Sequence, residues 1–291
     1  MRLTFLGTSA ANAYPEAFCS CRNCQGARAE GGRSLRKRSS ALVNDDLLID
    51  LGPDIMAAAQ MHRVDLTRVQ YCLQTHPHAD HMDLSHLLSR SPGFGVVGAP
   101  RLHYYASAAT LARADETFRR DLAGYGLFDP LAGQELNLEL HRVEPLQPIQ
   151  AGPYRVTAFP ANHAPGCGAL LYAVEREGRC LFYGVDTAAL PDSTWQAFHQ
   201  QQVRFDLVVL DHTYGPEEEG SDHLCARELA AHARRMREEG LLKEGGRVFA
   251  SHIAHEGNPP HADLAAFASR HGYEVAYDGL PVVCDGLSGT A

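Results

Sequence analysis

The sequence predicts an α/β protein in which two β-sheets pack face to face and helices cover their outer faces. Three observations support this: short β-rich runs dominate both halves of the chain, helical patterns interrupt them, and no internal repeat divides the sequence. A sheet must bury one face against another layer, so two packed sheets with outer helices satisfy such a pattern. We expect residues 1–291 to form one domain.

In the first half, the predicted strands are apolar runs separated by turn residues. A helix is expected from Pro53 to about Met61, because proline is favourable at the first helical position. The polar segment Asn44-Asp45-Asp46 between two runs indicates a β-hairpin. The predicted strands are Leu3–Leu6, Ala41–Val43, Leu47–Ile49 and Val69–Leu73.

The middle of the chain, from Met82 to about Pro148, gives the weakest pattern, with an Ala-rich helical stretch at Ala106–Ala123. Order returns in the second half, where two helices are expected at His223–Glu239 and Ala262–His271. The strands predicted there are Arg155–Phe159, Ala169–Val174, Cys180–Tyr183, Asp206–Leu210, Val248–Ser251 and Pro281–Cys284.

Composition and charge exclude several classes of function. A hydrophobic content of 45% permits a sizeable core, and no apolar run is long enough to cross a bilayer. The net charge of −9 argues against a broad nucleic-acid interface, which needs clustered lysine and arginine. The Met1–Gly7 segment is too short for a signal peptide. We expect a cytoplasmic protein that binds neither membrane nor nucleic acid, with a homodimer among the open oligomeric states.

The strongest functional signal is the segment Thr75-His76-Pro77-His78-Ala79-Asp80-His81, directly after a predicted strand. Imidazole and carboxylate groups suit zinc, manganese or iron. Positions 76, 78 and 80 project to one side of an extended chain, and a turn must follow. His76 and His78 can then reach one metal, and Asp80 and His81 a second. The alternative, a polar loop rich in histidine by chance, fits such a dense motif poorly.

A His-x-His-x-Asp-His segment after a strand resembles the signature of the metallo-β-lactamase superfamily, whose fold is a four-layer αββα sandwich. The family's remaining ligands have counterparts at the ends of predicted strands, in Asn162-His163, Tyr183–Thr187 and Ser251-His252. The resemblance implies one metal bound by three histidines, a second bound by two histidines and an aspartate, and a bridging aspartate. These are His76, His78 and His163; Asp80, His81 and His252; and Asp186.

Three of the eight cysteines, Cys19, Cys21 and Cys24, crowd together. Without a signal peptide, such a cluster indicates a metal site more than disulfides. With the opening Leu6–Ser9, the cluster resembles the PhnP family, phosphodiesterases of phosphonate breakdown, and PqqB proteins have a similar cluster. In PhnP-like proteins the three cysteines and one histidine hold a structural zinc, which implies His255 as fourth ligand here. The alternative is that His255 is a surface residue.

The PhnP resemblance also implies a catalytic role for His223. In that family an active-site histidine opens the helix before the last metal ligand, and His223 has the matching place. Its imidazole could donate a proton to the leaving oxygen; the alternative is an ordinary helix N-terminus with Asp222 as cap. His223 and the ligand Asp80 are the predicted catalytic residues. Asp211-His212-Thr213 could support the shell around the metals. The remaining singled-out histidines are predicted to be structural or solvated: His86, His103, His141, His199, His232 and His271.

The sequence thus predicts a hydrolase with two active-site divalent ions, zinc or manganese with iron as a further option, and one structural zinc. The favoured substrate is a small anionic phosphodiester, cyclic ones included. A lactonase or thioesterase, a tRNase Z-like nuclease, a PqqB-like oxidation in cofactor biosynthesis and a non-catalytic metal-binding module are the alternatives. The PqqB branch tends to have an altered His-x-His-x-Asp-His segment, which is complete here. The long 82–162 segment leaves the substrate open.

Overall fold

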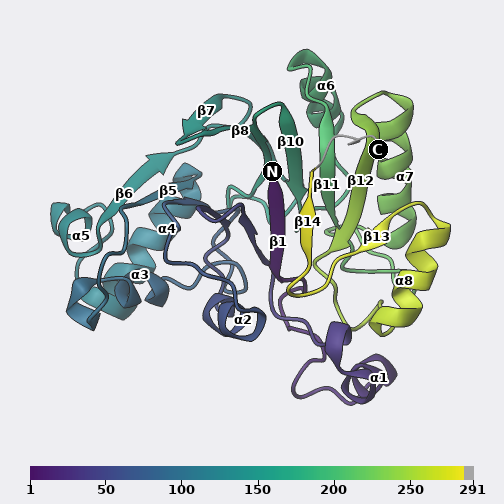
Figure 1. The fold of residues 1–291 in the computed structure, drawn as a ribbon, viewed down its shortest axis with the longest axis horizontal. Coiled ribbons are helices and arrows are strands. Elements are labelled where there is room, and N and C mark those ends of the chain that lie inside the picture. The colour runs from purple at the N-terminus through teal and green to yellow at the C-terminus, as the bar shows by residue number, and fades with distance from the viewer. Residues whose placement is uncertain (285–291) are drawn as a thin grey trace, which may run out of the picture.

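The computed structural model describes residues 1–284, which contain two seven-stranded sheets (Figure 1). The first sheet has the order β14-β1-β2-β3-β4-β5-β6, and the second has the order β13-β12-β11-β10-β9-β8-β7. The strands of the first sheet are β1 (Arg2–Gly7), β2 (Ser40–Val43), β3 (Leu47–Ile49), β4 (Tyr71–Leu73), β5 (Leu102–Ala106), β6 (Leu138–Arg142) and β14 (Pro281–Val283). Those of the second are β7 (Pro148–Ala151), β8 (Tyr154–Pro160), β9 (Leu170–Arg176), β10 (Arg179–Gly184), β11 (Phe205–Asp211), β12 (Leu242–Ser251) and β13 (Glu274–Val275).

Helices cover the outer faces of both sheets. Against the first sheet pack α2 (Ile55–His62), α3 (Ser85–Ser89), α4 (Ala108–Phe118) and α5 (Pro130–Glu135). Against the second pack α6 (Asp192–Gln200), α7 (Ala226–Glu238) and α8 (His261–Arg270), with α1 (Arg22–Glu30) beside them. Three short turns complete the described elements: η1 (Gly32–Ser34), η2 (Pro92–Phe94) and η3 (Arg119–Ala123).

The inner faces of the two sheets share one apolar core. Phe5 and Leu73 of the first sheet pack in the same cluster as Val156 and Val209 of the second, all of them fully buried. Separate apolar clusters lie between each sheet and its helices. The layers therefore run helix, sheet, sheet, helix, which confirms the predicted αββα sandwich.

The strands predicted around the site are present, and the hairpin between β2 and β3 is antiparallel as expected. The sequence patterns did not identify four strands (β5, β6, β7 and β13) or four helices (α1, α3, α5 and α6). Most of these lie in the middle segment, where tertiary packing decides the structure of weakly patterned sequence. The Ala-rich stretch 106–123 divides into the end of β5, helix α4 and the π-helical turn η3.

The helix expected from His223 begins three residues later, at Ala226. Its N-terminus is closed by Cys225, whose backbone N–H donates to the carboxylate of Glu228 at 3.0 Å. His223 therefore lies in the loop before the helix, and Asp222 is not the cap. Similarly, α2 begins at Ile55 rather than at Pro53. Pro53 and Asp54 form a turn before α2, whereas Cys225 forms an isolated β-bridge with Gly215 before α7.

The loops that carry the predicted ligands lie at one edge of the sandwich, because the strands before them run in the same direction within each sheet. β3 and β4 are parallel in one sheet, and β10, β11 and β12 are parallel in the other. β8 and β10 both pair antiparallel to β9, so they run in the same direction. Side chains that follow these strands therefore meet where the two sheets present their carboxyl ends. No helix in the described residues is long and apolar enough to cross a membrane.

A substitution at the end of β1 can test the close packing of this strand against the segment at Arg38. A Cβ added to Gly7 would lie 1.9 Å from the backbone carbonyl oxygen of Arg38, which cannot move without displacing its segment. We expect Gly7→Ala to lower the free energy of unfolding by about 1–3 kcal/mol, as overpacking does. Gly133→Ala, in helix α5, is the control, because the nearest atom to its added Cβ is 3.4 Å away. Equal denaturation midpoints for both variants would contradict the packing described.

Candidate metal centres

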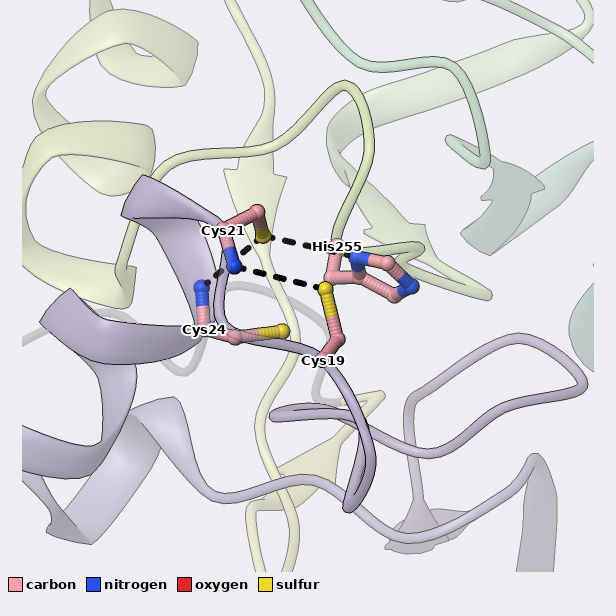
Figure 2. A group of neighbouring side chains, drawn as sticks. All are labelled: Cys19, Cys21, Cys24 and His255. Carbon is pink, nitrogen blue, oxygen red and sulfur yellow. Dashed lines mark hydrogen bonds between the residues drawn. The ribbon is translucent and has the colours of Figure 1, made fainter.

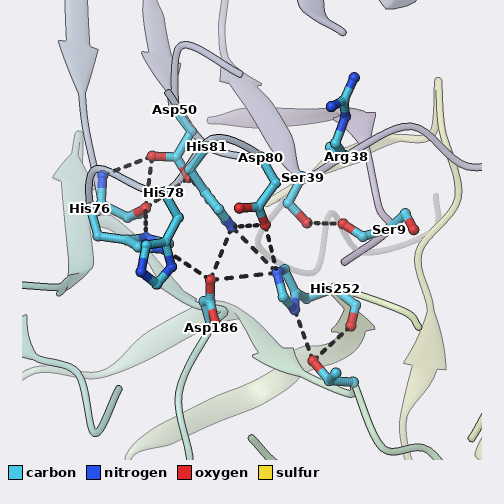
Figure 3. A network of polar contacts seen from close by, with 12 residues as sticks. Ser9, Arg38, Ser39, Asp50, His76, His78, Asp80, His81, Asp186 and His252 are labelled. Atoms are coloured by element: carbon cyan, nitrogen blue, oxygen red, sulfur yellow. Dashed lines mark hydrogen bonds and ion pairs between the residues drawn. The ribbon is translucent and has the colours of Figure 1, made fainter. Parts of the chain in front are cut away.

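The seven predicted metal ligands lie together where these strands end, with Asp186 in their middle. Figure 3 labels all of them except His163. Oδ2 of Asp186 is 3.0 Å from Nε2 of His76 and 3.1 Å from Nε2 of His81. Nε2 of His252 is 3.6 Å from the same oxygen, and Nδ1 of His163 is 3.2 Å from Oδ1. The carboxylate of Asp186 thus contacts ligands from both predicted metal sites.

Each predicted metal site also has close contacts among its own ligands. Nδ1 of His78 lies 3.0 Å from Nε2 of His76 and 3.2 Å from Nε2 of His163. In the second group, Nε2 of His81 is 3.1 Å from Asp80 and 3.3 Å from His252. Both groups, each with Asp186, have ligand atoms close enough to surround one ion. The structure therefore brings all seven side chains together, and their binding of two metals stays a prediction.

Asp50, at the end of β3, orients the His-x-His-x-Asp-His segment. Its fully buried carboxylate accepts a hydrogen bond from Nδ1 of His81 at 2.7 Å. The same carboxylate accepts from the backbone N–H and the hydroxyl of Thr75, and from Nε2 of Gln74. Because a carboxylate only accepts, Nδ1 of His81 carries the proton donated to Asp50, and Nε2, which faces Asp186, is the nitrogen that could bind a metal. A carboxylate behind a histidine ligand is a common arrangement in metal sites.

Asp211 and Thr213 hold the opposite side of the centre. The hydroxyl of Thr213 donates to the carbonyl of His252 and accepts from Nδ1 of that ring at 2.8 Å. Oδ2 of Asp211 accepts from the backbone N–H of Asp186 at 2.8 Å. Asp50, Asp186 and His252 all have positive φ values, of 65°, 60° and 58°. Such backbone strain in non-glycine residues concentrates at functional sites, where surrounding contacts hold it in place.

The centre contains several buried carboxylates and no lysine or arginine paired with them in the described residues. Four carboxylates, those of Asp50, Asp80, Asp186 and Asp211, are less than a tenth exposed. Within the described residues, their ion-pair partners are all histidines. A buried carboxylate is unfavourable unless it is paired or coordinates a metal. The donor set therefore fits divalent cations.

Burial lowers the pKa of His76, His78 and His163, which favours the neutral imidazole that metal binding requires. Two buried atoms next to these rings, Nδ1 of His163 and Oδ1 of Asp186, make no hydrogen bond in the described structure. Buried polar atoms rarely lack a partner. The two atoms lie 3.2 Å apart without a hydrogen bond, so they agree with the buried carboxylates in fitting a bound cation.

The pKa values in the second ligand group also indicate an environment that favours positive charge. Burial opposes ionisation of Asp80 and Asp186, yet neighbouring imidazoles hold the pKa of both carboxyls well below its usual value. Burial also opposes protonation of His81, but the charges of Asp80 and Asp50 raise its pKa well above the usual value. The surrounding carboxylates thus favour positive charge at this position.

His223 lies beside the metal ligands, although it precedes α7 rather than opening it. Nδ1 of His223 is 3.1 Å from Oδ2 of Asp211 and 3.3 Å from Oδ1 of Asp186. Burial opposes its protonation, but the hydrogen bond and charge of Asp211, with the charge of Asp186, raise its pKa to about 9. The structure places the predicted catalytic histidine at the centre, within reach of a bound ligand.

A cavity of about 530 Å³ opens onto the centre. Its lining includes the loop after β1, from Ser9 to Ala13, and the residues Tyr214 and His223. Three acidic residues, Glu218, Asp222 and Glu256, line the cavity together with the ligands, and no lysine or arginine lies among the lining residues. The cavity can hold a small molecule, and His223 is the lining side chain whose raised pKa favours a positive charge.

The cysteine cluster forms a second candidate metal centre, between α1 and the loop after β12 (Figure 2). Sγ of Cys21 lies 3.6 Å from Nδ1 of His255, and it accepts from the backbone N–H of Cys24 at 3.4 Å. The backbone N–H of Cys21 in turn donates to Sγ of Cys19 at 3.4 Å. His255 is buried rather than exposed, so the surface alternative is wrong. Three thiols and one imidazole match a closed tetrahedral zinc site.

Comparison with known proteins identifies the family to which the chain belongs. The model of a family described as a β-lactamase superfamily domain matches residues 46–253, which include the seven clustered ligands. The chain belongs to the metallo-β-lactamase superfamily. Coenzyme PQQ synthesis protein B of Cupriavidus necator is 26% identical, with an alignment that covers 95% of this chain and 97% of that protein.

Two solved structures have the same metallo-β-lactamase fold. A diphosphatase from the PhnP family aligns with a TM-score of 0.72 at 21% identity, covering 97% of each chain. Zinc-bound PqqB from Methylobacterium extorquens aligns with a TM-score of 0.72 at 20% identity, covering 97% of this chain and 100% of that one. At these identities, the structures establish likeness of fold alone.

Sequence reasoning missed Asp50, and of the segment Asp211-His212-Thr213, which it considered as support for the metals, only the two outer residues contact the centre. Asp50 is a polar residue directly after the apolar run of β3, and that position was the available signal. His212 points away from the centre, where its ring contacts Asn258 and the hydroxyl of Tyr273 at 2.8 Å each. Its neighbours Asp211 and Thr213 contact the centre, because alternate residues of an extended chain face opposite sides.

The central position of Asp186 gives a prediction about metal content. Asp186→Ala should lose both active-site metals and with them turnover, because the carboxylate contacts both ligand groups. Elemental analysis of the purified protein measures the metal bound per chain. Asp192→Ala, at an exposed residue of α6, is the control and should keep the full complement. An unchanged metal content in Asp186→Ala would show that the carboxylate is not a ligand.

The cysteine cluster gives an independent prediction. Cys24→Ser should remove a zinc ion that resists chelators which strip the active-site metals, and it should lower the melting temperature. Cys167→Ser, at a half-buried cysteine outside the cluster, should retain that zinc. If a chelator-resistant zinc remains in Cys24→Ser, or is absent from the unmodified protein, the cluster is not a structural zinc site.

Proposed function

We propose that the protein is a metal-dependent hydrolase of small phosphodiesters. The observation that supports this best is the clustering of seven predicted metal-ligand side chains beside a cavity, which five of them and His223 line. The fold shared with a diphosphatase of the PhnP family agrees with phosphate chemistry. The proposed ligands are His76, His78 and His163 for one ion, Asp80, His81 and His252 for the other, and Asp186 for both, with structural zinc at Cys19, Cys21, Cys24 and His255.

Two divalent ions in this centre would supply neutralisation of the phosphoryl oxygens and activation of a water nucleophile. The protein's own groups fix the geometry. Asp50 and Thr213 hold the rings of His81 and His252, so that their Nε2 atoms face Asp186 and Asp80. Such preorganised groups require no rearrangement when charge develops on the reacting phosphate.

His223 is the proposed proton donor to the leaving oxygen. Asp211 accepts a hydrogen bond from its Nδ1 atom and so fixes the orientation of the ring. In the protonated ring, the second nitrogen, Nε2, can donate to a substrate in the cavity that His223 lines. A leaving alkoxide needs such a donor, because it is a poor leaving group without a proton.

The cavity walls favour a diester over more highly charged phosphates. Glu218, Asp222 and Glu256 line the cavity, and its lining contains no lysine or arginine. A diester has one negative charge, which the metals can neutralise, whereas a monoester dianion or a nucleic acid brings further charges close to these carboxylates. Like charges at short range repel, and more strongly in a partly enclosed site. The proposed substrate is therefore a small diester with an uncharged or cationic remainder.

The experiment is an assay of metal-reconstituted protein against diesters, cyclic nucleotides, monoesters, lactones and thioesters. His223→Ala should lower turnover of a diester with a poor leaving group by about 10²–10⁴-fold, the usual contribution of general acid catalysis. Its metal content should not change. His199→Ala, at an exposed histidine paired with Glu239, is the control and should keep full turnover. Unchanged hydrolysis by His223→Ala would contradict its role, and preference for lactones or thioesters would contradict the substrate class.

A second candidate function is a step in the synthesis of the cofactor PQQ. It is supported by the 26% identity to Coenzyme PQQ synthesis protein B across nearly the whole of both chains. The complete His-x-His-x-Asp-His segment favours hydrolysis instead, since the resemblance implies an altered segment in that branch. Restoration of PQQ formation in cells that lack their own protein B, with no hydrolysis of any ester in the panel, would favour the second candidate.

A further inference from the structure

A third group of metal-binding side chains lies at the edge of the first sheet and shares no residue with the two centres above. His103 comes from β5, and Glu139 and His141 come from β6. Nδ1 of His103 is 3.0 Å from Nε2 of His141. Oε2 of Glu139 is 3.6 Å from the first nitrogen, and Oε1 is 3.7 Å from the second. Tetrahedral zinc with bonds of ~2.0–2.1 Å would space its ligand atoms about 3.3 Å apart, so the spacing suits an ion.

The strand register explains why the three side chains meet. β5 and β6 are parallel, with His103 opposite Glu139 and Tyr105 opposite His141. Opposite residues in a sheet project to the same face, as do alternate residues of one strand. Tyr105 is in turn opposite Leu73, and both belong to the core between the sheets. The face of the sheet that is apolar at Leu73 and Tyr105 therefore presents His103, Glu139 and His141 where β5 and the edge strand β6 pair.

Aromatic rings hold the two imidazoles in place. The ring of Tyr105 stacks on His141 with centroids 4.4 Å apart, and that of Tyr71 stacks on His103 at 5.7 Å. The side chains of His103 and His141 are 30% and 28% exposed, and that of Glu139 is 45% exposed. Ligands with restricted rotamers lose less entropy when an ion binds. Their partial exposure leaves a path for the ion and room for water as a further ligand.

We propose that His103, Glu139 and His141 bind a divalent transition-metal ion, zinc above all, that joins the edge strand β6 to β5. Imidazole with carboxylate suits zinc, copper and nickel, whereas magnesium and calcium prefer oxygen ligands alone. The two imidazoles contact each other, and Arg101 pairs with Glu139 at 3.4 Å. This exposed ion pair is a weak competitor for the carboxylate. The site does not depend on the proposed hydrolase function.

The test compares zinc bound per chain in full-length variants at the same buffered free zinc concentration. The unmodified protein should bind one zinc more than His141→Gln, whatever the occupancy of the other two centres. His199→Gln, the same change at a histidine paired with Glu239 on other elements, should bind as much zinc as the unmodified protein. Arg101→Gln, which removes the competing guanidinium, should lower the free zinc concentration needed to fill the site.

Equal zinc content in the unmodified protein and His141→Gln would overturn the proposal. Equal losses in His141→Gln and His199→Gln would overturn it as well, because they would indicate adsorption to histidines in general. If His141→Gln does not fold, as judged by circular dichroism, Glu139→Gln replaces it, since that side chain is nearly half exposed. The same difference of one zinc is expected, and its absence overturns the proposal.

Discussion

The constraint on which this structure depends is the buried negative charge of four carboxylates, which no lysine or arginine balances in the described chain. Four buried carboxylates, those of Asp50, Asp80, Asp186 and Asp211, face a ring of imidazoles, and none of them pairs with a lysine or arginine in the described chain. Burying such groups is unfavourable unless they are paired or bind a metal, so the arrangement fits divalent cations. The sandwich makes this arrangement possible, because strands of both sheets end at the same edge and bring distant loops together.

Much of the centre could be predicted from the sequence, because its ligands follow apolar runs and four of them lie within residues 76–81. Asp50 could not be recognised in the same way. A single aspartate after a strand is common, and only the fold shows that it lies 2.7 Å from His81. The cluster at His103 and His141 was hidden for a related reason, because β5 and β6 lie in weakly patterned sequence and their pairing creates the contact. Local pattern predicts strand ends, whereas contacts between strands require the topology.

The fold by itself does not decide the reaction, because one fold supports several chemistries. The structure is similar to both a diphosphatase of the PhnP family and PqqB, with the same TM-score. The proposal therefore rests on the site of this chain: seven candidate metal ligands, a histidine held by Asp211, and acidic cavity walls that disfavour highly charged substrates. These features together favour hydrolysis of a small anion with a single charge.

The most direct test of this account is anomalous X-ray diffraction from crystals of the metal-loaded protein, recorded above and below the absorption edge of the bound metal. Two anomalous peaks should flank Asp186, one against His76, His78 and His163, and the other against Asp80, His81 and His252. Their presence would show that cations balance the buried carboxylates. Crystals grown with excess metal that show no peak beside Asp186 would contradict the account, whatever is bound elsewhere on the protein.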